Sequence, residues 1–318
     1  MAGGYTHITV AQLGIRQAVY QAGLLHDDAR LGLSFFKTHC IVGAISPDYP
    51  YMHLNHADSA AWADAMHKGK AVDLLRVMAA RVAAMSDEAV RHKCLAWLFG
   101  FASHLVTDGV VHPIVNLKVG VYEDNKVCHR RCEMSQDVFI NPRLGLGPLE
   151  NNQQITRSVK ALTDEVEGRK GLDRDIDALW RGALKVVYPG HPEPDVGGWH
   201  EGMWNVMEVW QHGGLLFFAR DTAARHALVY PAQADPRFIE NLEAPCGEPL
   251  HFDAVADMAI ARTLEMWGWL SLTLQGKASP LDSLVSWSLD TGIDETGKMV
   301  FWPGPNPRVP SPGVKCCD

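Results

Sequence analysis

The sequence predicts an all-α fold, with one helical-bundle domain over residues 1–275 and an extended C-terminal tail rich in Gly and Pro over residues 276–318. Three observations support this prediction. Apolar residues recur every three to four positions in many segments, and the alternation typical of strands is scarce. A content of 47% hydrophobic and 21% charged residues in 318 residues is ordinary for a globular chain with a substantial core.

Five segments place apolar residues on one face of a helix, as expected where that face packs against a core. They lie at residues 11–25, 72–82, 155–166, 176–187 and 256–274. Residues 141–143 and 189–198 contain Pro or Gly and are expected to separate neighbouring helices. The sequence therefore predicts several amphipathic helices joined by short breaks.

The most apolar helix is predicted over residues 86–112. Ser86 is the expected N-cap, and Pro113 disfavours helical geometry at His112, so the helix is expected to end there. The stretch from Cys94 to Ala102 is apolar on all sides, as in a buried central helix. Because this stretch is much shorter than the roughly 18 residues that cross a bilayer, no transmembrane segment is predicted.

The formal net charge of −8 argues against a broad basic surface, so a general nucleic-acid scaffold is not expected. The first residues contain no basic region followed by an apolar core, and no signal peptide is predicted. A cytoplasmic location is therefore expected, with secretion by a signal-independent route left open. The seven cysteines form no paired framework, which predicts mostly free thiols.

The distribution of histidine is the first indication of function. Ten of the 15 histidines precede residue 133, and neutral imidazole is a common metal ligand. His104 and Asp108 lie one helical turn apart in the most apolar helix, His112 follows one turn later, and His129 and Glu133 repeat the spacing. A carboxylate in such a helix is costly unless it is paired or binds a cation. A buried His–Asp hydrogen bond and a metal site both remain open, and the second pair favours the metal site.

A further carboxylate, Asp48, follows Pro47 in a predicted turn, and His53, His56 and His67 lie within the next 20 residues. The common role of such an aspartate is to cap a turn or helix. By composition alone, each of these histidines is more often a surface residue than a ligand.

Two other patterns have weaker support. Cys128 and Cys132 flank the second histidine pair, but a structural zinc site usually needs four ligands in a compact motif, so both are interpreted as small buried residues. The adjacent His26 and Asp27 suggest an HD-type phosphohydrolase as a minor alternative, although the surrounding sequence resembles a helix end and a cap.

In chain order, Tyr5-Thr6-His7, Gly43–Asp48, Trp62–His67, His104–Pro113 and His129–Glu133 resemble the zinc-dependent phospholipase C family, which is related to the zinc-dependent single-strand nucleases. The resemblance covers roughly residues 5 to 140. It implies an all-α fold that binds two to three Zn²⁺ ions. The implied ligands are Asp48, His67, His104 and Asp108 for one zinc, His112, His129 and Glu133 for the second, and Asp108 with His7 for a third, with His53 or His56 as alternatives to His67.

The resemblance also implies a phosphodiester hydrolase in which zinc ions assist the attack of water on phosphorus. The substrate would be a phosphodiester, with a phospholipid as one candidate. Asp48 is expected to orient or deprotonate the water, because it is the candidate carboxylate on a turn rather than on a helix. The alternatives are a single-strand nuclease or nucleotidase on the same metals, and a non-enzymatic metal-binding helical protein.

Overall fold

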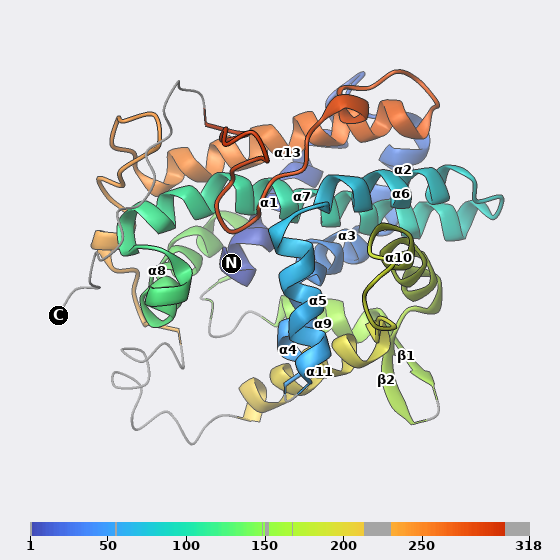
Figure 1. Cartoon of the computed structure of the whole chain (residues 1–318), viewed down its shortest axis with the longest axis horizontal. Helices are drawn as coiled ribbons and strands as arrows, with labels where there is room; N and C mark the ends of the chain where they lie inside the picture. Colours follow the sequence, from blue (N-terminus) through green and yellow to red (C-terminus); the bar gives the residue numbers. More distant parts are fainter. Residues whose placement is uncertain are drawn as a thin grey trace.

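The computed structural model describes residues 2–302 except residues 55, 148, 150–152, 167 and 213–229, and it confirms the all-α prediction (Figure 1). In chain order the α-helices are α1 (Gly4–Ala18), α2 (Asp27–Phe35), α3 (Lys37–Gly43), α4 (Tyr49–Met52), α5 (Ala57–Lys68), α6 (Ala71–Ala83), α7 (Glu88–Val119), α8 (Tyr122–Ile140), α9 (Gln154–Ala161), α10 (Arg174–Val187), α11 (Val196–His212) and α13 (Phe252–Leu274). Short 3-10 helices are η1 (Ser46–Asp48), η2 (Asn141–Leu144), η5 (Pro236–Phe238) and η6 (Pro280–Ser283).

Helix α7 is the centre of the bundle. It runs through the middle of the molecule in Figure 1, and α1, α2, α3, α6, α8 and α13 all pack against it. By length and composition α7 could span a membrane, but its most apolar 18-residue window is entirely buried in the protein. It therefore has the character of a core helix.

Both predicted ends of this helix were wrong. The N-cap is Asp87 rather than Ser86, and its carboxylate accepts a hydrogen bond from the Val90 N–H at 3.0 Å. The helix also continues through Pro113 to Val119. Tertiary contacts support this last part, because Trp302 Nε1 donates to the carbonyl of Val110 and Asn116 Nδ2 donates to the carbonyl of Asp290.

A close backbone crossing joins α3 to α7. A Cβ atom added at Gly43 would lie 2.1 Å from the carbonyl oxygen of Trp97, and one added at Gly100 would lie 2.0 Å from that of Cys40. Only glycine permits this approach. The crossing brings the chain after α3 against the next turn of α7, where His104 Nδ1 lies 2.9 Å from the carbonyl oxygen of Ala44.

Two predicted helices are shorter than expected. The helix predicted over residues 11–25 ends at Ala18 with Val19 as its C-cap, and the left-handed φ of 77° at Gly23 rules out helix as far as residue 25. In the segment 155–166, α9 ends at Ala161 and is followed by strand β1 (Thr163–Val166), which pairs antiparallel with β2 (Arg169–Leu172). Gly168, with a φ of 79°, allows the turn between the strands.

The segment after α13 covers one side of α7. Leu281, Trp287, Leu289 and Phe301 are buried, and residues 287–302 contain isolated β-bridges. The predicted tail therefore contributes to the core as far as residue 302, while residues 303–318 lie outside the described part of the chain.

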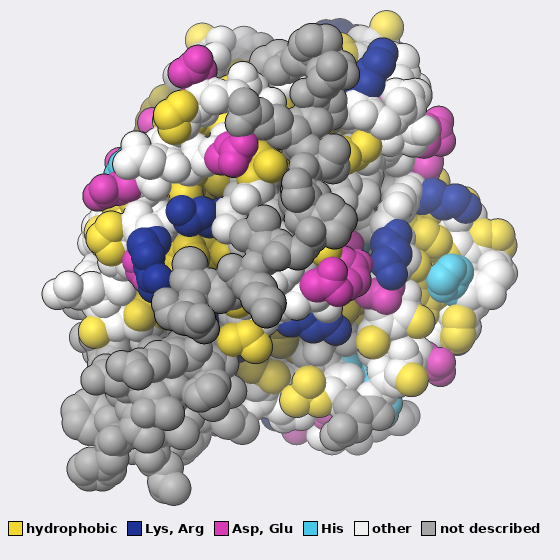
Figure 2. Space-filling model, turned by 60° about the vertical axis from the view of Figure 1, so that its left-hand side comes forward, with side chains coloured by type: hydrophobic (Ala, Val, Ile, Leu, Met, Phe, Trp, Pro, Cys, Tyr) yellow, Lys and Arg dark blue, Asp and Glu magenta, His cyan; other side chains and the backbone are white. Residues whose placement is uncertain are grey.

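The described surface does not contradict the prediction, made from the net charge, that the protein has no broad basic surface. On the face drawn in Figure 2, basic and acidic side chains lie interspersed among hydrophobic ones. They do not gather there into one broad basic patch.

Candidate metal centre

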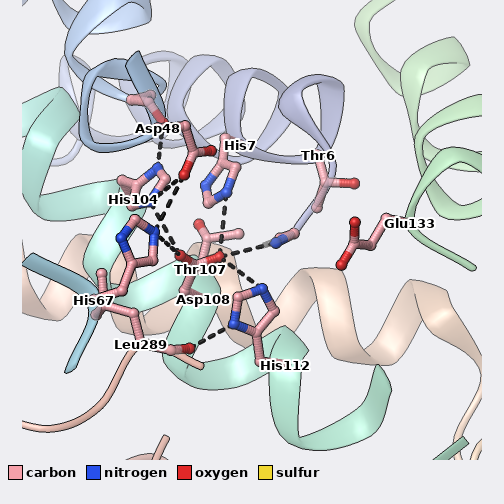
Figure 3. A network of polar contacts seen from close by, with 12 residues as sticks. Thr6, His7, Asp48, His67, His104, Thr107, Asp108, His112, Glu133 and Leu289 are labelled. Atoms are coloured by element: carbon pink, nitrogen blue, oxygen red, sulfur yellow. Dashed lines mark hydrogen bonds and ion pairs between the residues drawn. The ribbon is translucent and has the colours of Figure 1, made fainter. Parts of the chain in front are cut away.

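Side chains from α1, η1, α5 and α7 converge on the fully buried carboxylate of Asp108 (Figure 3). Its Oδ1 lies 3.3 Å from His7 Nε2 and 3.2 Å from His112 Nε2, and its Oδ2 lies 3.0 Å from His104 Nε2. The backbone N–H of Ala2 also donates to Oδ1 at 3.0 Å. The sequence predicted that His104 and Asp108 share one face of a helix. The fold adds His7 and the backbone of Ala2, from the start of the chain, to this pair.

Asp48 forms the second carboxylate of this cluster. His67 Nε2 lies 3.2 Å from Asp48 Oδ1 and 3.9 Å from Asp108 Oδ2, so His67 reaches both carboxylates. His53 and His56 instead stack on each other with ring centroids 3.6 Å apart, and His53 Nδ1 lies 2.9 Å from Ser59 Oγ. The structure therefore brings His67, rather than either alternative, to Asp48.

His129 and Glu133 lie on α8 beside this cluster. His129 Nδ1 is 3.7 Å from Glu133 Oε1, and both side chains are nearly buried. In Figure 3 the carboxylate of Glu133 lies near His112, with no direct contact drawn between them. The predicted second group of ligands is therefore close to the first.

Four imidazoles are oriented by backbone carbonyls. A ring nitrogen of each lies within hydrogen-bonding distance of one carbonyl oxygen. The pairs are His67 Nδ1 with Ala63, His104 Nδ1 with Ala44, His112 Nδ1 with Leu289 and His129 Nε2 with Gly120. A carbonyl can only accept, so these nitrogens carry the proton and the other nitrogen of a neutral ring presents a lone pair to the cluster. Histidine ligands of metals are typically oriented in this way.

The unpaired atoms of the cluster fit metal ions. His104 Nε2, His112 Nε2, His129 Nδ1 and both nitrogens of His7 make no hydrogen bond of good geometry, and neither does Asp108 Oδ2. Lone pairs on buried imidazoles would face carboxylate oxygens about 3 Å away, which is repulsive unless a cation lies among them. Two groups have ligand atoms within 4.8 Å of one another. They are His7, Asp48 and His104, and His67, His104 and Asp108.

The electrostatics of the same side chains show how strongly they interact. Burial would raise the pKa of Asp108, but His112, His104 and His7 hold it well below its ordinary value. Burial would lower the pKa of His67, but its hydrogen bond to Asp48 and the nearby carboxylates raise it to about 9. The carboxylates are therefore ionised and attract either protons or metal cations to the imidazoles.

The other sequence candidates lie elsewhere or have other partners. His26 caps α2 and its Nδ1 lies 2.8 Å from Ser271 Oγ, while Asp27 pairs with Arg30, so the HD-type arrangement is absent at these residues. Cys132 is a buried free thiol and Cys128 is disulfide-bonded, which does not suit a thiolate zinc site. The free thiols among the described cysteines are Cys40, Cys94, Cys132 and Cys246.

Sequence reasoning missed Asp137 and the cavity beside it. Asp137 is fully buried and accepts hydrogen bonds from the N–H groups of Tyr5 and Thr6, from Thr6 Oγ1 and from the hydroxyl of Tyr230. It therefore caps the start of α1 from α8. A cavity of about 710 Å³ lies next to it, and Asp48 and Glu133 form part of its wall. A binding space thus opens directly onto the candidate ligands.

The fold and the site define an all-α protein with a buried His/Asp cluster that suits metal ions. Comparison with protein families gives a match to the family described as zinc dependent phospholipase C over residues 6–190, which is more than half of the chain. The chain belongs to this family. Comparisons with curated proteins and with solved structures gave no significant match.

Proposed function

We propose that this protein is a zinc-dependent phosphodiester hydrolase of the phospholipase C type. Family membership and the convergence of histidines on Asp108 and Asp48 support this function. The single observation that carries most weight is the set of imidazoles fixed by backbone carbonyls, with their other nitrogens facing two ionised carboxylates. Zinc ions held there would neutralise the phosphodiester oxygens and activate water for attack.

We assign the zinc ligands as the eight residues predicted from the sequence. Asp48, His67, His104 and Asp108 would hold one ion, His112, His129 and Glu133 a second, and His7 with Asp108 a third. The imidazoles and Asp108 are buried, whereas Asp48 and Glu133 keep 12% and 11% of their side chains exposed. Asp48 and Glu133 also face the cavity, which supports a substrate position at that side of the cluster.

Asp48 is the proposed base. It ends η1, on the cavity wall, and its Oδ1 lies 3.2 Å from His67 Nε2, so that one ion would bind both atoms. Its other oxygen is then available to orient a water molecule or accept its proton. The Asp48→Asn variant keeps one oxygen for zinc but loses the basic carboxylate, so turnover should fall at least about a hundredfold while much of the zinc remains. A variant with near wild-type turnover would exclude this role.

The proposed function is tested by elemental analysis together with an activity assay. Purified protein should contain two to three zinc ions per chain and should release phosphocholine from a phosphatidylcholine substrate in a chelator-sensitive reaction. Less than one zinc per chain, with activity indifferent to chelators, would reject the hydrolase. Cleavage of single-stranded DNA in place of the lipid would instead identify a nuclease on the same metals.

A further inference from the structure

Residues 287–292 form a tight turn that makes hydrogen bonds to the end of α5 and to the second half of α7. Within the turn, the Gly292 N–H donates to the carbonyl oxygen of Ser288 at 2.8 Å. Gly292 has a φ of 68°, and a Cβ atom there would lie 2.7 Å from the carbonyl oxygen of Gly109 on α7. Only glycine allows this conformation and this approach together. The turn is therefore fixed closely against the helix that carries Asp108.

Leu289, in the middle of this turn, contacts both groups of candidate ligands through its backbone. Its N–H donates at 2.7 Å to the carbonyl oxygen of His67, in the last turn of α5, where carbonyls lack partners within the helix. Its carbonyl oxygen lies within hydrogen-bonding distance of His112 Nδ1 (Figure 3). One buried residue thus joins a histidine of the first proposed zinc site to a histidine of the second.

Asn116 makes a parallel contact one helical turn after His112. Its Nδ2 donates to the carbonyl oxygen of Asp290 at 2.7 Å, and the residue is only 5% exposed. The consecutive carbonyls of Leu289 and Asp290 therefore face side chains from two consecutive turns of α7. Because an amide donates in a fixed direction, Asn116 sets the position of the turn along α7. It thereby also sets the position of the carbonyl that orients His112.

We infer that Asn116 is a positioning residue for the zinc ion that His112 would hold, and that it acts through the turn 287–292. The inference rests on the proposed function and on its assignment of ligands. Loss of the hydrogen bond that orients a histidine ligand typically costs about 10- to 100-fold in metal affinity. Without the Asn116 contact the Leu289 carbonyl is free to shift, and His112 loses the partner that directs its Nε2 toward Asp108.

The turn lies outside residues 6–190, over which the chain matches its family, so family membership alone does not imply this role. The effect should also be confined to one ion. His67 Nδ1 and His104 Nδ1 take their partners, the carbonyls of Ala63 and Ala44, from α5 and from the chain after α3. Both rings should therefore keep their orientation when the turn moves.

The test compares two buried asparagines that make the same kind of bond. Asn141, on η2, donates through its Nδ2 to the carbonyl oxygen of Gly147 at 3.0 Å. Leucine has a branched shape like that of asparagine but no donor, and Asn116 lines a cavity of about 250 Å³ that leaves room for it. Asn116→Leu and Asn141→Leu should each lower the melting temperature by about 2 to 4 °C.

Only the change at Asn116 should reach the metals. In competition with a chelator, Asn116→Leu should weaken one bound zinc ion by about tenfold or more, whereas Asn141→Leu should bind zinc as the wild type does. Asn116→Asp, which keeps the shape of asparagine without the amide donor, is a second variant with the same expected loss. The visible spectrum of the Co²⁺-loaded full-length protein reports on the arrangement of the ligands, and it should change in both Asn116 variants and not in Asn141→Leu.

Equal zinc affinities and equal Co²⁺ spectra in the Asn116 and Asn141 variants would overturn the inference. Hydrolysis of a phosphodiester by the wild type would in that case leave the proposed function intact. A loss confined to the Asn116 variants, in a protein whose wild type hydrolyses no phosphodiester, would support the inference and reject the hydrolase. A wild-type chain that binds no zinc would reject both.

Discussion

The crossing of α3 and α7 predicts a large effect from one added methyl group. In Gly100→Ala the new Cβ would lie 2.0 Å from the carbonyl oxygen of Cys40, whereas ordinary contacts begin at 3.4 Å. The two backbones would therefore have to separate by about 1.4 Å. Overpacking a core in this way costs about 3 kcal/mol, and the gain in helix propensity from Gly to Ala offsets about 1 kcal/mol. A net loss of about 2 kcal/mol should lower the melting temperature by about 4 to 8 °C.

The same displacement should reach the metal centre, because His104 lies one turn after Gly100 and its Nδ1 contacts the carbonyl oxygen of Ala44 at 2.9 Å. We expect weaker zinc binding in Gly100→Ala, measured by competition with a chelator, alongside the lower melting temperature in calorimetry. Gly268→Ala is the control, since its nearest neighbour is the flexible end of Leu24 at 3.3 Å and its stability should be equal or higher. A Gly100→Ala protein that melts within about 1 °C of wild type would refute the crossing.

Three further predictions concern single side chains. His104→Ala should lose both zinc and thermal stability, because bound metal contributes folding free energy, and a variant with wild-type zinc content and melting temperature would show that His104 is not a ligand. His129→Ala should lose the second zinc but keep the zinc at Asp108, and elemental analysis that finds the wild-type ratio would contradict that assignment. Burial raises the pKa of Asp137 to about 6 from an ordinary 3.8, so the folded state holds this proton more tightly and the contribution of Asp137 to stability should fall as pH rises from about 4 to 6. The unfolding free energy of wild type minus that of Asp137→Asn, measured in denaturant across this window, should show the decline, and parallel pH profiles would argue against it.

The sequence predicted those parts of the fold and site that depend on local spacing. The pairs His104–Asp108 and His129–Glu133 face common points because residues four apart share one face of a helix, whatever surrounds them. The all-α class followed from the same periodicity and is confirmed by the structure. The resemblance to the family then predicted that Asp48 and His67 join the first pair, and the structure brings them together.

The parts of the fold and of the site that the sequence did not predict depend on contacts between distant segments. Pro113 disfavours helix locally, yet α7 continues past it because residues 287–302 hydrogen-bond to the turns on either side. The orientation of His112 depends on the carbonyl of Leu289, and any residue type supplies a carbonyl, so no sequence pattern reveals it. The cavity wall likewise combines methionines from α4, α8 and α11, whose meeting is a property of the packed fold.

At the proposed metal centre, one buried charge would couple folding to metal binding. Asp108 is fully buried and ionised, and an unpaired charge at that depth would strongly destabilise the fold. Without metal, protons on His67 and His104 supply the compensating charge, since the carboxylates raise the pKa of both despite burial. Zinc must displace these protons because it binds neutral imidazole. At the proposed sites protons and zinc would therefore compete for the same lone pairs, and the carbonyls of Ala63 and Ala44 would keep the rings aimed at the carboxylates in either state.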